Sequence, residues 1–231
     1  MVSYIFQGIL QGLTEFLPVS SSGHLTLFQY FSGMKDLEAN MLTDVALHAG
    51  TLLAVIFFFR ADLLPYFTPT GWKDPARRRI AFLIIAGSVP TALIGLTFKD
   101  SFETLFSMPK AVCIALFITG LLLLASEKLK KNSNCCELSN FSYIKAIVTG
   151  IAQGLAITPG ISRSGSTIAT GLLLGLKGED AARFSFLLMI PAVGGATLLE
   201  TKDLFEAGLP AAIDPTGLIV GTFAAAVTGF L

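Results

Sequence analysis

The first segment that could do chemistry combines an amide, an acid, hydroxyl groups and an imidazole. Gln11 and Glu15 are four positions apart and therefore share one face of a helix. Pro18 then breaks the pattern, and a run of serines leads to His24. A carboxyl group in such an apolar region is by default functional, with a structural hydrogen bond to a neighbouring helix as the alternative. The candidate residues of this segment are Gln11, Glu15, Ser20, Ser21, Ser22 and His24.

The second segment supplies the opposite charge. Pro159–Thr167 reads PGISRSGST, so Arg163 is flanked by hydroxyl residues at the expected start of a helix. A guanidinium beside hydroxyls and free backbone N–H groups has the donors of a phosphate site, because its planar fork holds two oxygen atoms. Alternatively, Arg163 reaches to the membrane interface or only neutralises Glu15, but neither explains the hydroxyls. The candidate phosphate-binding residues are Ser20, Ser162, Arg163, Ser164 and Thr167.

Together the two segments would suffice for phosphoryl transfer. Cationic and N–H donors neutralise the phosphate oxygens, the Glu15 carboxylate holds a divalent metal or a proton, and Ser21 or His24 attacks or carries protons. The residues do not decide between Ser21 and His24. The chain has no Gly-Lys-Ser/Thr phosphate loop, so ATP use is not indicated. A second histidine, His48, either lines the same site or packs in the core.

The two segments are copies of one another at a constant offset of 142 residues. Gly8–His24 reads GILQGLTEFLPVSSSGH, and Gly150–Ser166 reads GIAQGLAITPGISRSGS. In a membrane, polar loops of this kind are tolerated only where protein or a water-filled cavity satisfies their backbone groups. The repeat therefore marks a site. The identical pairs are Gly8 and Gly150, Gln11 and Gln153, Gly12 and Gly154, Leu13 and Leu155, Ser20 and Ser162, Ser22 and Ser164, and Gly23 and Gly165.

The composition predicts that a membrane surrounds these segments. Of 231 residues, 53% are hydrophobic and 14% charged, and the mean hydropathy is +0.71, whereas about 25% of a soluble domain is charged. The 16 basic and 16 acidic residues cancel, so net charge gives no reason to expect nucleic acid as a partner. We therefore expect an all-α, multi-span integral membrane protein.

About 20 apolar residues make one helical crossing, and this length divides the chain into spans. The loops Arg60–Arg79 and Ser126–Asn140 are basic and should face the cytoplasm. The acidic-leaning segments Lys35–Asp44 and Glu200–Asp214 should then lie outside. The predicted spans are Val45–Phe59, Ile80–Phe98, Pro109–Ala125, Ala182–Leu199 and a last one from about Ala211 to Leu231.

The two repeat regions, about Ser3–Phe31 and Tyr143–Leu176, are too long for plain spans and are interrupted at Pro18 and at Pro159–Gly160. Both are predicted to form re-entrant helix–loop–helix hairpins. Three crossings between them make the repeats inverted, with the two tips meeting near the midplane. The alternative is that each hairpin includes one full crossing. We expect a single membrane domain, with repeat 1 at about 1–125 and repeat 2 at about 143–231.

These residues resemble the bacterial undecaprenyl-diphosphatase family, the bacitracin-resistance type of membrane phosphatase. The family's first motif has an acid or amide one turn before a Glu, then Pro-Val-Ser-Ser and Gly-His, and it matches Gln11, Glu15, Pro18–Ser21 and Gly23–His24. Its second motif, Pro-Gly-x-Ser-Arg-Ser-Gly-x-Thr, matches Pro159–Thr167 in full. The likeness runs to about residue 230. Family members usually continue further, so a final helix is expected to be absent.

The resemblance implies hydrolysis of a C55 polyprenyl diphosphate to the monophosphate and inorganic phosphate, which recycles the lipid carrier of cell-wall sugars. It implies that Glu15 with Gln11 supports a divalent cation, Mg²⁺ or Ca²⁺, and that Ser21 or His24 is the nucleophile or proton carrier. Arg163, with the hydroxyl residues named above, would bind the diphosphate. Gln11 stands where many members have Glu, which leaves one carboxylate for the metal.

Two other classes of function remain open at this point. Inverted repeats with broken helices also occur in transporters, so a flippase for polyprenyl phosphates or another lipid or anion carrier is the main alternative. A structural membrane subunit is a weaker one, because it requires no intramembrane Glu and Arg. We expect a multi-pass protein of the plasma membrane whose site opens to the outer face. The sequence leaves a homodimer open.

Overall fold

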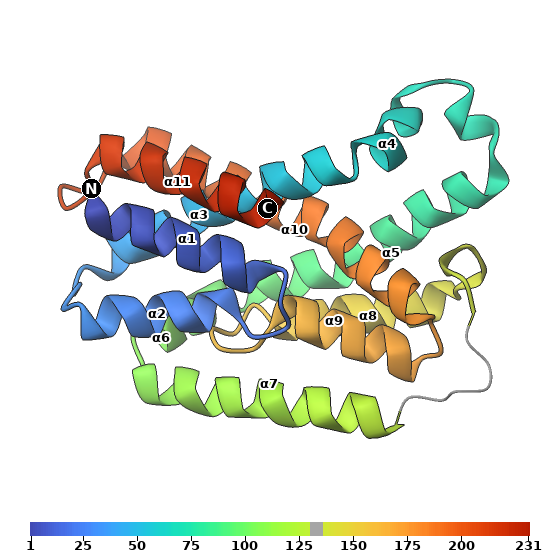
Figure 1. Cartoon of the computed structure of the whole chain (residues 1–231), viewed down its shortest axis with the longest axis horizontal. Coiled ribbons are helices and arrows are strands. Elements are labelled where there is room, and N and C mark those ends of the chain that lie inside the picture. Colours follow the sequence, from blue (N-terminus) through green and yellow to red (C-terminus); the bar gives the residue numbers. More distant parts are fainter. Residues whose placement is uncertain (130–135) are drawn as a thin grey trace.

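The computed structural model describes residues 1–129 and 136–231, and Figure 1 shows a bundle of helices along one long axis. The basic residues Lys130 and Lys131, part of a loop predicted to be cytoplasmic, lie outside the described residues. Short 3₁₀ turns occur at Leu64–Phe67, Gly71–Lys73 and Leu138–Asn140. The α-helices are α1 (Val2–Glu15), α2 (Ser21–Phe31), α3 (Leu37–Phe58), α4 (Arg60–Leu63), α5 (Pro75–Thr97), α6 (Lys99–Phe106), α7 (Pro109–Leu129), α8 (Tyr143–Leu155), α9 (Arg163–Leu173), α10 (Gly178–Ala207) and α11 (Pro215–Phe230).

Among the described residues, four helices are long and apolar enough to cross a membrane, namely Leu37–Phe58, Pro75–Thr97, Pro109–Lys128 and Gly178–Leu204. They correspond to the first four predicted spans, and the prediction of an all-α integral membrane protein is confirmed. The last predicted span forms the shorter α11. This helix begins at Pro215 because the Asp214 carboxylate caps it and accepts a hydrogen bond from the Thr216 N–H at 3.1 Å.

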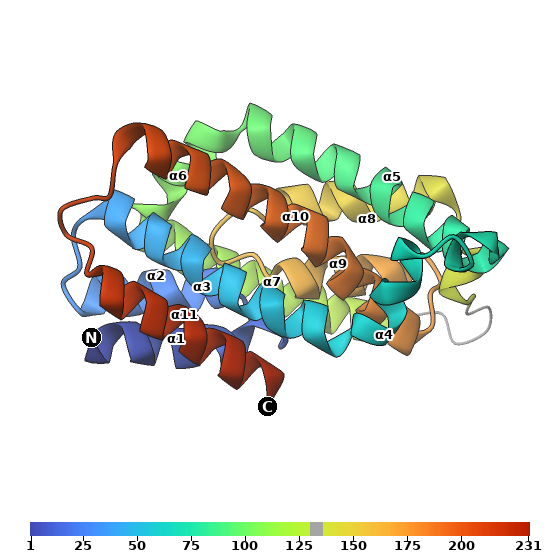
Figure 2. The same cartoon turned by 90° about the horizontal axis from the view of Figure 1, so that it is seen from above.

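Each repeat region folds as a hairpin of two short helices. At 1.5 Å per residue, α1 and α2 are about 21 and 17 Å long, less than the roughly 30 Å of a hydrocarbon core. In Figure 1 the α1–α2 hairpin extends from one end of the long axis and the α8–α9 hairpin from the other, and their turns lie near the middle. Figure 2 shows the same arrangement from above. That these hairpins turn back inside the bilayer stays a prediction.

The first helix of each hairpin is polar on its inner face and apolar on its outer face. In α1 the buried residues include Gln7, Gln11 and Glu15, whereas Phe6, Ile9 and Leu13 are exposed. In α8 the buried residues include Thr149 and Gln153, and the exposed ones are Tyr143, Ile144, Ile147, Val148, Ile151 and Leu155. In a water-soluble protein the apolar face of a helix would be buried. The opposite arrangement is expected where lipid surrounds the helix and polar groups face the bundle interior.

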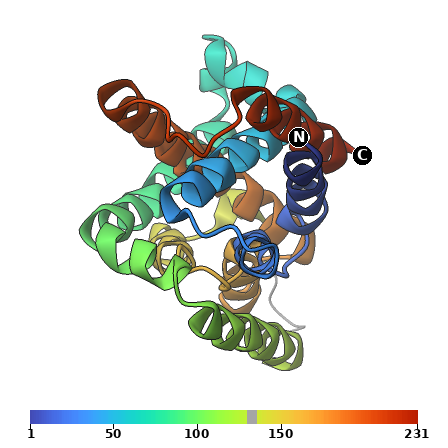
Figure 3. The ribbon, with the colours of Figure 1, turned by 90° about the vertical axis from the view of Figure 1, so that its left-hand side faces the viewer.

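The repeat seen in the sequence also relates helices in space. Adding 142 to Ser21–Phe31 gives Arg163–Leu173, so α2 corresponds to α9 residue for residue. The helix α1 packs along α11 and its counterpart α8 packs along α5, while α3 packs against α10 near the centre. Figure 3, seen along the bundle, shows α1 beside α11. Each hairpin therefore packs against a helix from the other predicted repeat.

Glycines allow these helices to approach closely. Gly8 and Gly12 in α1, and Gly150 and Gly154 in α8, have the small-xxx-small spacing of membrane helix interfaces. A Cβ on Gly8 would collide with the carbonyl oxygen of Gly221. A Cβ on Gly150 would collide with that of Gly87. The two contacts fix the depth at which the hairpins sit in the bundle.

Charged segments gather at the two ends of the long axis. One end carries α4, the 3₁₀ turns that follow it and the start of α5, and an ion pair of 2.8 Å joins Arg183 to Asp62 there. The other end carries the N-terminus and the connection from α10 to α11, where Lys99 pairs with Asp203 at 3.3 Å. Such separation of charge is expected for loops on opposite sides of a membrane.

Candidate active site

The turn between α1 and α2 is built around Ser20. Its backbone has φ of 65°, a left-handed conformation that is rare for a residue other than glycine. Its Oγ accepts a hydrogen bond from the Gly23 N–H at 3.3 Å and so caps α2. The same Oγ lies 3.3 Å from Ser22 Oγ. The serine run is thus needed locally to start a helix directly after the turn.

The turn between α8 and α9 repeats this arrangement. Ser162 Oγ accepts from the Gly165 N–H at 3.0 Å and lies 3.3 Å from Ser164 Oγ. A helix outside the hairpin also holds this turn. The Thr119 hydroxyl of α7 donates to the Gly160 carbonyl at 2.9 Å and accepts from the Ser162 N–H at 3.0 Å. Sequence reasoning missed Thr119, because a single threonine in an apolar span gives no signal.

The two turns touch each other. Ser164 Oγ of the second turn lies 3.3 Å from the Leu17 carbonyl oxygen of the first, as hydrogen-bond donor. A Cβ on Gly23 would lie only 2.9 Å from Gly160 Cα, so the two backbones are in close contact. The expectation that the hairpin tips meet is confirmed for the turns themselves.

Glu15 is the centre of the group of side chains that this meeting creates. It is 5% exposed, and its Oε1 accepts a hydrogen bond from the guanidinium of the partly exposed Arg163 in an ion pair. Its Oε2 accepts one from the Ser21 hydroxyl and a third, at 3.0 Å, from Gln11 Nε2. Acid, hydroxyl and guanidinium are therefore brought together from α1, α2 and α9. The pairing of Arg163 with Glu15, an alternative in the sequence analysis, is present.

His48 also belongs to this group. Its Nε2 lies 3.4 Å from Glu15 Oε2 and 3.4 Å from Ser21 Oγ. Its Nδ1 lies 2.7 Å from the Asp44 carbonyl oxygen, which can only accept, so Nδ1 carries a proton and donates. Of the two possibilities left by the sequence, the structure places His48 in the site.

Not every predicted residue contacts the carboxylate. Among the described contacts, the His24 ring hydrogen-bonds through Nδ1 to the Ser20 carbonyl at 2.7 Å and not to Glu15. Thr167 Oγ1 lies 2.6 Å from Ser185 Oγ of α10 and also donates to the Arg163 carbonyl. Ser20 and Ser162 cap helices. These hydroxyls hold the backbone around the site.

One oxygen next to Glu15 is left without a partner. Gln11 Oε1 is buried and accepts no hydrogen bond within the part of the chain described, while its Nε2 also contacts Thr51 Oγ1 at 3.3 Å. A carboxylate and an amide oxygen are ligands that Mg²⁺ and Ca²⁺ prefer. Within the described ranges, no three His, Cys, Asp or Glu residues are grouped as metal ligands. The residues present thus fit a metal that takes its remaining ligands from substrate or water.

A second buried polar group adjoins the site. Gln29 Nε2 donates to Asp44 Oδ1 at 2.7 Å and to Gln7 Oε1 at 3.0 Å. All three side chains are buried. They stand nearer than Glu15, Ser21 and His48 to the ends of α1, α2 and α3 that lie beside the N-terminus in Figure 1. The sequence analysis missed this group, although Asp44 and His48 at i and i+4 share a helix face.

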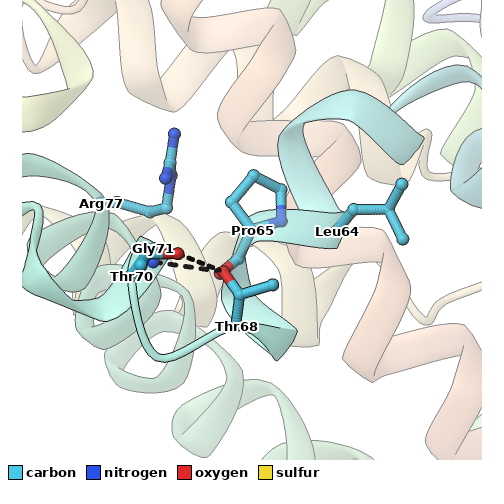
Figure 4. Close-up of a pocket in the computed structure, with 6 residues that line it drawn as sticks. All are labelled: Leu64, Pro65, Thr68, Thr70, Gly71 and Arg77. Atoms are coloured by element: carbon cyan, nitrogen blue, oxygen red, sulfur yellow. Dashed lines mark hydrogen bonds between the residues drawn. The ribbon is translucent and has the colours of Figure 1, made fainter.

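Two hollows lie elsewhere on the molecule. Figure 4 shows one of about 440 Å³ at the basic end, where the side chain of Arg77 stands beside the turn formed by Pro65–Gly71. A second, of about 300 Å³, lies between α3, α10 and α11. Glu15, Ser21 and Arg163 line neither. In the group around Glu15 the carboxylate is buried, whereas the side chains of Arg163 and His48 are 20% and 21% exposed.

Comparison with known proteins bears directly on this arrangement. The family described as bacitracin resistance protein BacA matches residues 4–231. Proteins named undecaprenyl-diphosphatase are similar over most of their length. The one from Carboxydothermus hydrogenoformans is 48% identical over 225 residues, 96% of this chain and 82% of that protein. The one from Halothermothrix orenii is 45% identical over 226 residues, 98% of this chain and 84% of that protein.

Proposed function

This chain belongs to the family of bacitracin resistance protein BacA, and from that premise we propose how its buried group of side chains acts. The chain hydrolyses undecaprenyl diphosphate to undecaprenyl monophosphate and inorganic phosphate. The observation that carries the assignment to this site is the meeting of Glu15, Ser21 and Arg163 between two inverted hairpins. A polyprenyl tail stays in the bilayer, so its diphosphate requires a polar site at membrane depth.

Arg163 is proposed to bind the diphosphate. In the structure its guanidinium is paired with the Glu15 carboxylate, an anion that a phosphate oxygen would replace. An incoming diphosphate would replace this carboxylate and accept two parallel hydrogen bonds from the fork. Arg163 stands at the first position of α9, where the positive end of the helix dipole also favours an anion.

Ser21 is proposed to be the nucleophile, with His24 as the alternative on the same helix. The Ser21 hydroxyl already donates to Glu15, so the carboxylate orients Oγ and is placed to receive its proton. As Oγ bonds to the outer phosphorus, the bridging P–O bond breaks and undecaprenyl monophosphate leaves. Water then cleaves the phosphoserine and releases inorganic phosphate, and the Glu15 proton returns to Oγ. His24, one helical turn after Ser21, would carry protons to the leaving group or the water.

Glu15 and Gln11 would hold a divalent cation, Mg²⁺ or Ca²⁺. The unpartnered Gln11 Oε1 beside the carboxylate supports this assignment. Such an ion would neutralise charge on the diphosphate during transfer. Gln11 keeps Glu15 Oε2 in place through its Nε2, and Thr51 in turn holds Gln11.

We place the chain in the plasma membrane with its basic end in the cytoplasm. The site would then open toward the outer face. Two observations support this orientation. The basic segments gather at one end of the bundle, and the buried Gln7, Gln29 and Asp44 continue the polar interior toward the other.

The deciding experiment measures phosphate release from a polyprenyl diphosphate by the purified chain in detergent. Release should require Mg²⁺ or Ca²⁺ and should be lost in Glu15→Gln, which keeps the shape of the side chain without its charge. Thr104→Val in α6, a position far from the site at which one helix-internal hydrogen bond is lost, serves as control. Movement of a polyprenyl phosphate across proteoliposomes without phosphate release would instead support the transporter alternative.

A further inference from the structure

We propose that His48 is a positioning residue, which keeps the Ser21 hydroxyl and the Glu15 carboxylate in the relative position that the reaction requires. The inference rests on the proposed function of this site and adds a residue from α3 to it. Neither the first nor the second motif contains His48, which lies 24 residues after His24 in the chain. Its role therefore follows from contacts in the folded protein.

The ring of His48 has a fixed direction. Nδ1–H donates to the Asp44 carbonyl one turn earlier on the same helix, at 2.7 Å, so the ring cannot rotate without losing this bond. The opposite nitrogen, Nε2, then faces the site and lies 3.4 Å from both Ser21 Oγ and Glu15 Oε2. A ring oriented through one nitrogen by a backbone carbonyl while the other contacts reacting groups is the usual geometry of a functional histidine.

The surroundings of the ring do not favour a packing role. The side chain is 21% exposed, and its hydrogen-bond and ion-pair neighbours are Glu15, Ser21 and the Asp44 carbonyl. In α3 the hydrophobic clusters contain Leu47 in one case and, one and two turns beyond His48, Leu52 and Val55 in another. An apolar replacement would therefore preserve volume but remove the contacts that matter.

Positioning by His48 becomes necessary when substrate binds. Arg163 holds Glu15 Oε1, and this bond must break if the guanidinium is to bind a diphosphate. The contacts to Oε2 from Gln11 and His48 do not involve Arg163 and can persist. His48 would thus keep the carboxylate and Ser21 aligned while Arg163 changes its partner. Because His48 itself would not hold the diphosphate, its loss should lower kcat rather than raise KM.

The test compares His48→Ala, His48→Phe and His48→Gln with the unaltered chain. The Ala and Phe variants should lose kcat by on the order of 100-fold, the scale expected when a reacting group is misplaced, with KM little changed. The Gln variant offers both an N–H donor and an oxygen acceptor at this position, so it can bond to Glu15 or Ser21 and should recover much of the loss. Thr43→Val is the matched control, because Thr43 lies buried on the same helix and bonds only to the Ala39 carbonyl of its own turn.

Three results would contradict the proposals, and they can be told apart. If the unaltered chain releases no phosphate from polyprenyl diphosphate, the proposed function is wrong. If it does and His48→Phe keeps normal kcat, the positioning role alone is overturned. A loss of activity that is equal in the Phe and Gln variants, together with a matching fall in melting temperature, also contradicts the proposal, since it would reflect packing and not the nitrogen atom.

Discussion

The guanidinium of Arg163 and the carboxylate of Glu15 form one ion pair across 148 residues of sequence, and each comes from a different hairpin. The Glu15 carboxylate is buried and Arg163 is partly exposed, so removal of Arg163 would leave an uncompensated buried charge. The pair therefore joins the two repeats in the unliganded protein. The guanidinium that is proposed to bind the diphosphate is thus already paired with a carboxylate, which the substrate must displace.

Arg163→Lys should lower kcat/KM by on the order of 100-fold although the charge is kept, because an ammonium group cannot hold two oxygens in a plane. Steady-state phosphate release measures the effect. Arg78→Lys makes the same change on an exposed arginine at the basic end and should leave the rate unaltered. Near-normal turnover in Arg163→Lys would show that the reaction does not need two parallel hydrogen bonds from the guanidinium to the diphosphate.

Gln11→Glu should keep activity and lower the half-saturating concentration of Mg²⁺ or Ca²⁺, by about tenfold, because a second carboxylate raises affinity for a hard cation. Gln11 Nε2 lies 3.0 Å from Glu15 Oε2, so the new charge would stand beside the existing one. Gln11→Ala removes the amide oxygen and should shift the titration in the opposite direction. Identical metal titrations for all three chains would exclude position 11 from the metal site.

A phosphorylated intermediate on Ser21 should be stable in acid and labile in alkali, as a serine phosphate ester is. The measurement uses substrate labelled in its outer phosphate and rapid quenching at both pH extremes. The label should vanish in Ser21→Ala. An acid-labile, alkali-stable label, typical of phosphohistidine, would instead indicate attack by His24 or His48 and contradict the attack by Ser21 inferred from its bond to Glu15.

Gly150→Ala should lower the stability of the protein in detergent by about 1–3 kcal/mol, because its methyl group would collide with the Gly87 carbonyl oxygen. Thr91 Oγ1, which donates to the Gly150 carbonyl at 2.8 Å, would be displaced as well. Gly120→Ala is the matched control, since no heavy atom lies near its added Cβ, and it should be neutral or slightly stabilising. Equal melting temperatures for the two variants would show that α8 and α5 do not need this contact.

Much of the fold follows from local sequence. Long apolar runs require helices in lipid, so four spans could be placed from hydropathy alone. Hydropathy does not fix the ends of helices, since α11 starts at Pro215 because the Asp214 side chain caps it. The paired hairpins were predictable because Pro18 and Pro159–Gly160 cannot continue a helix, and because both copies keep a serine that caps the next one.

The sequence by itself determined which residues are polar inside an apolar chain, and therefore that Glu15, Ser21 and Arg163 mark a site. Only the tertiary structure decided their partners. It placed His48 against Glu15 and Ser21, pointed the His24 ring to a backbone carbonyl, and used Thr119 to hold the second turn. The physical reason is that spacing along one helix fixes which side chains share its face, whereas contacts between helices depend on how close their backbones come. Here that approach is set by glycines such as Gly8 and Gly150, at interfaces formed by segments far apart in the chain.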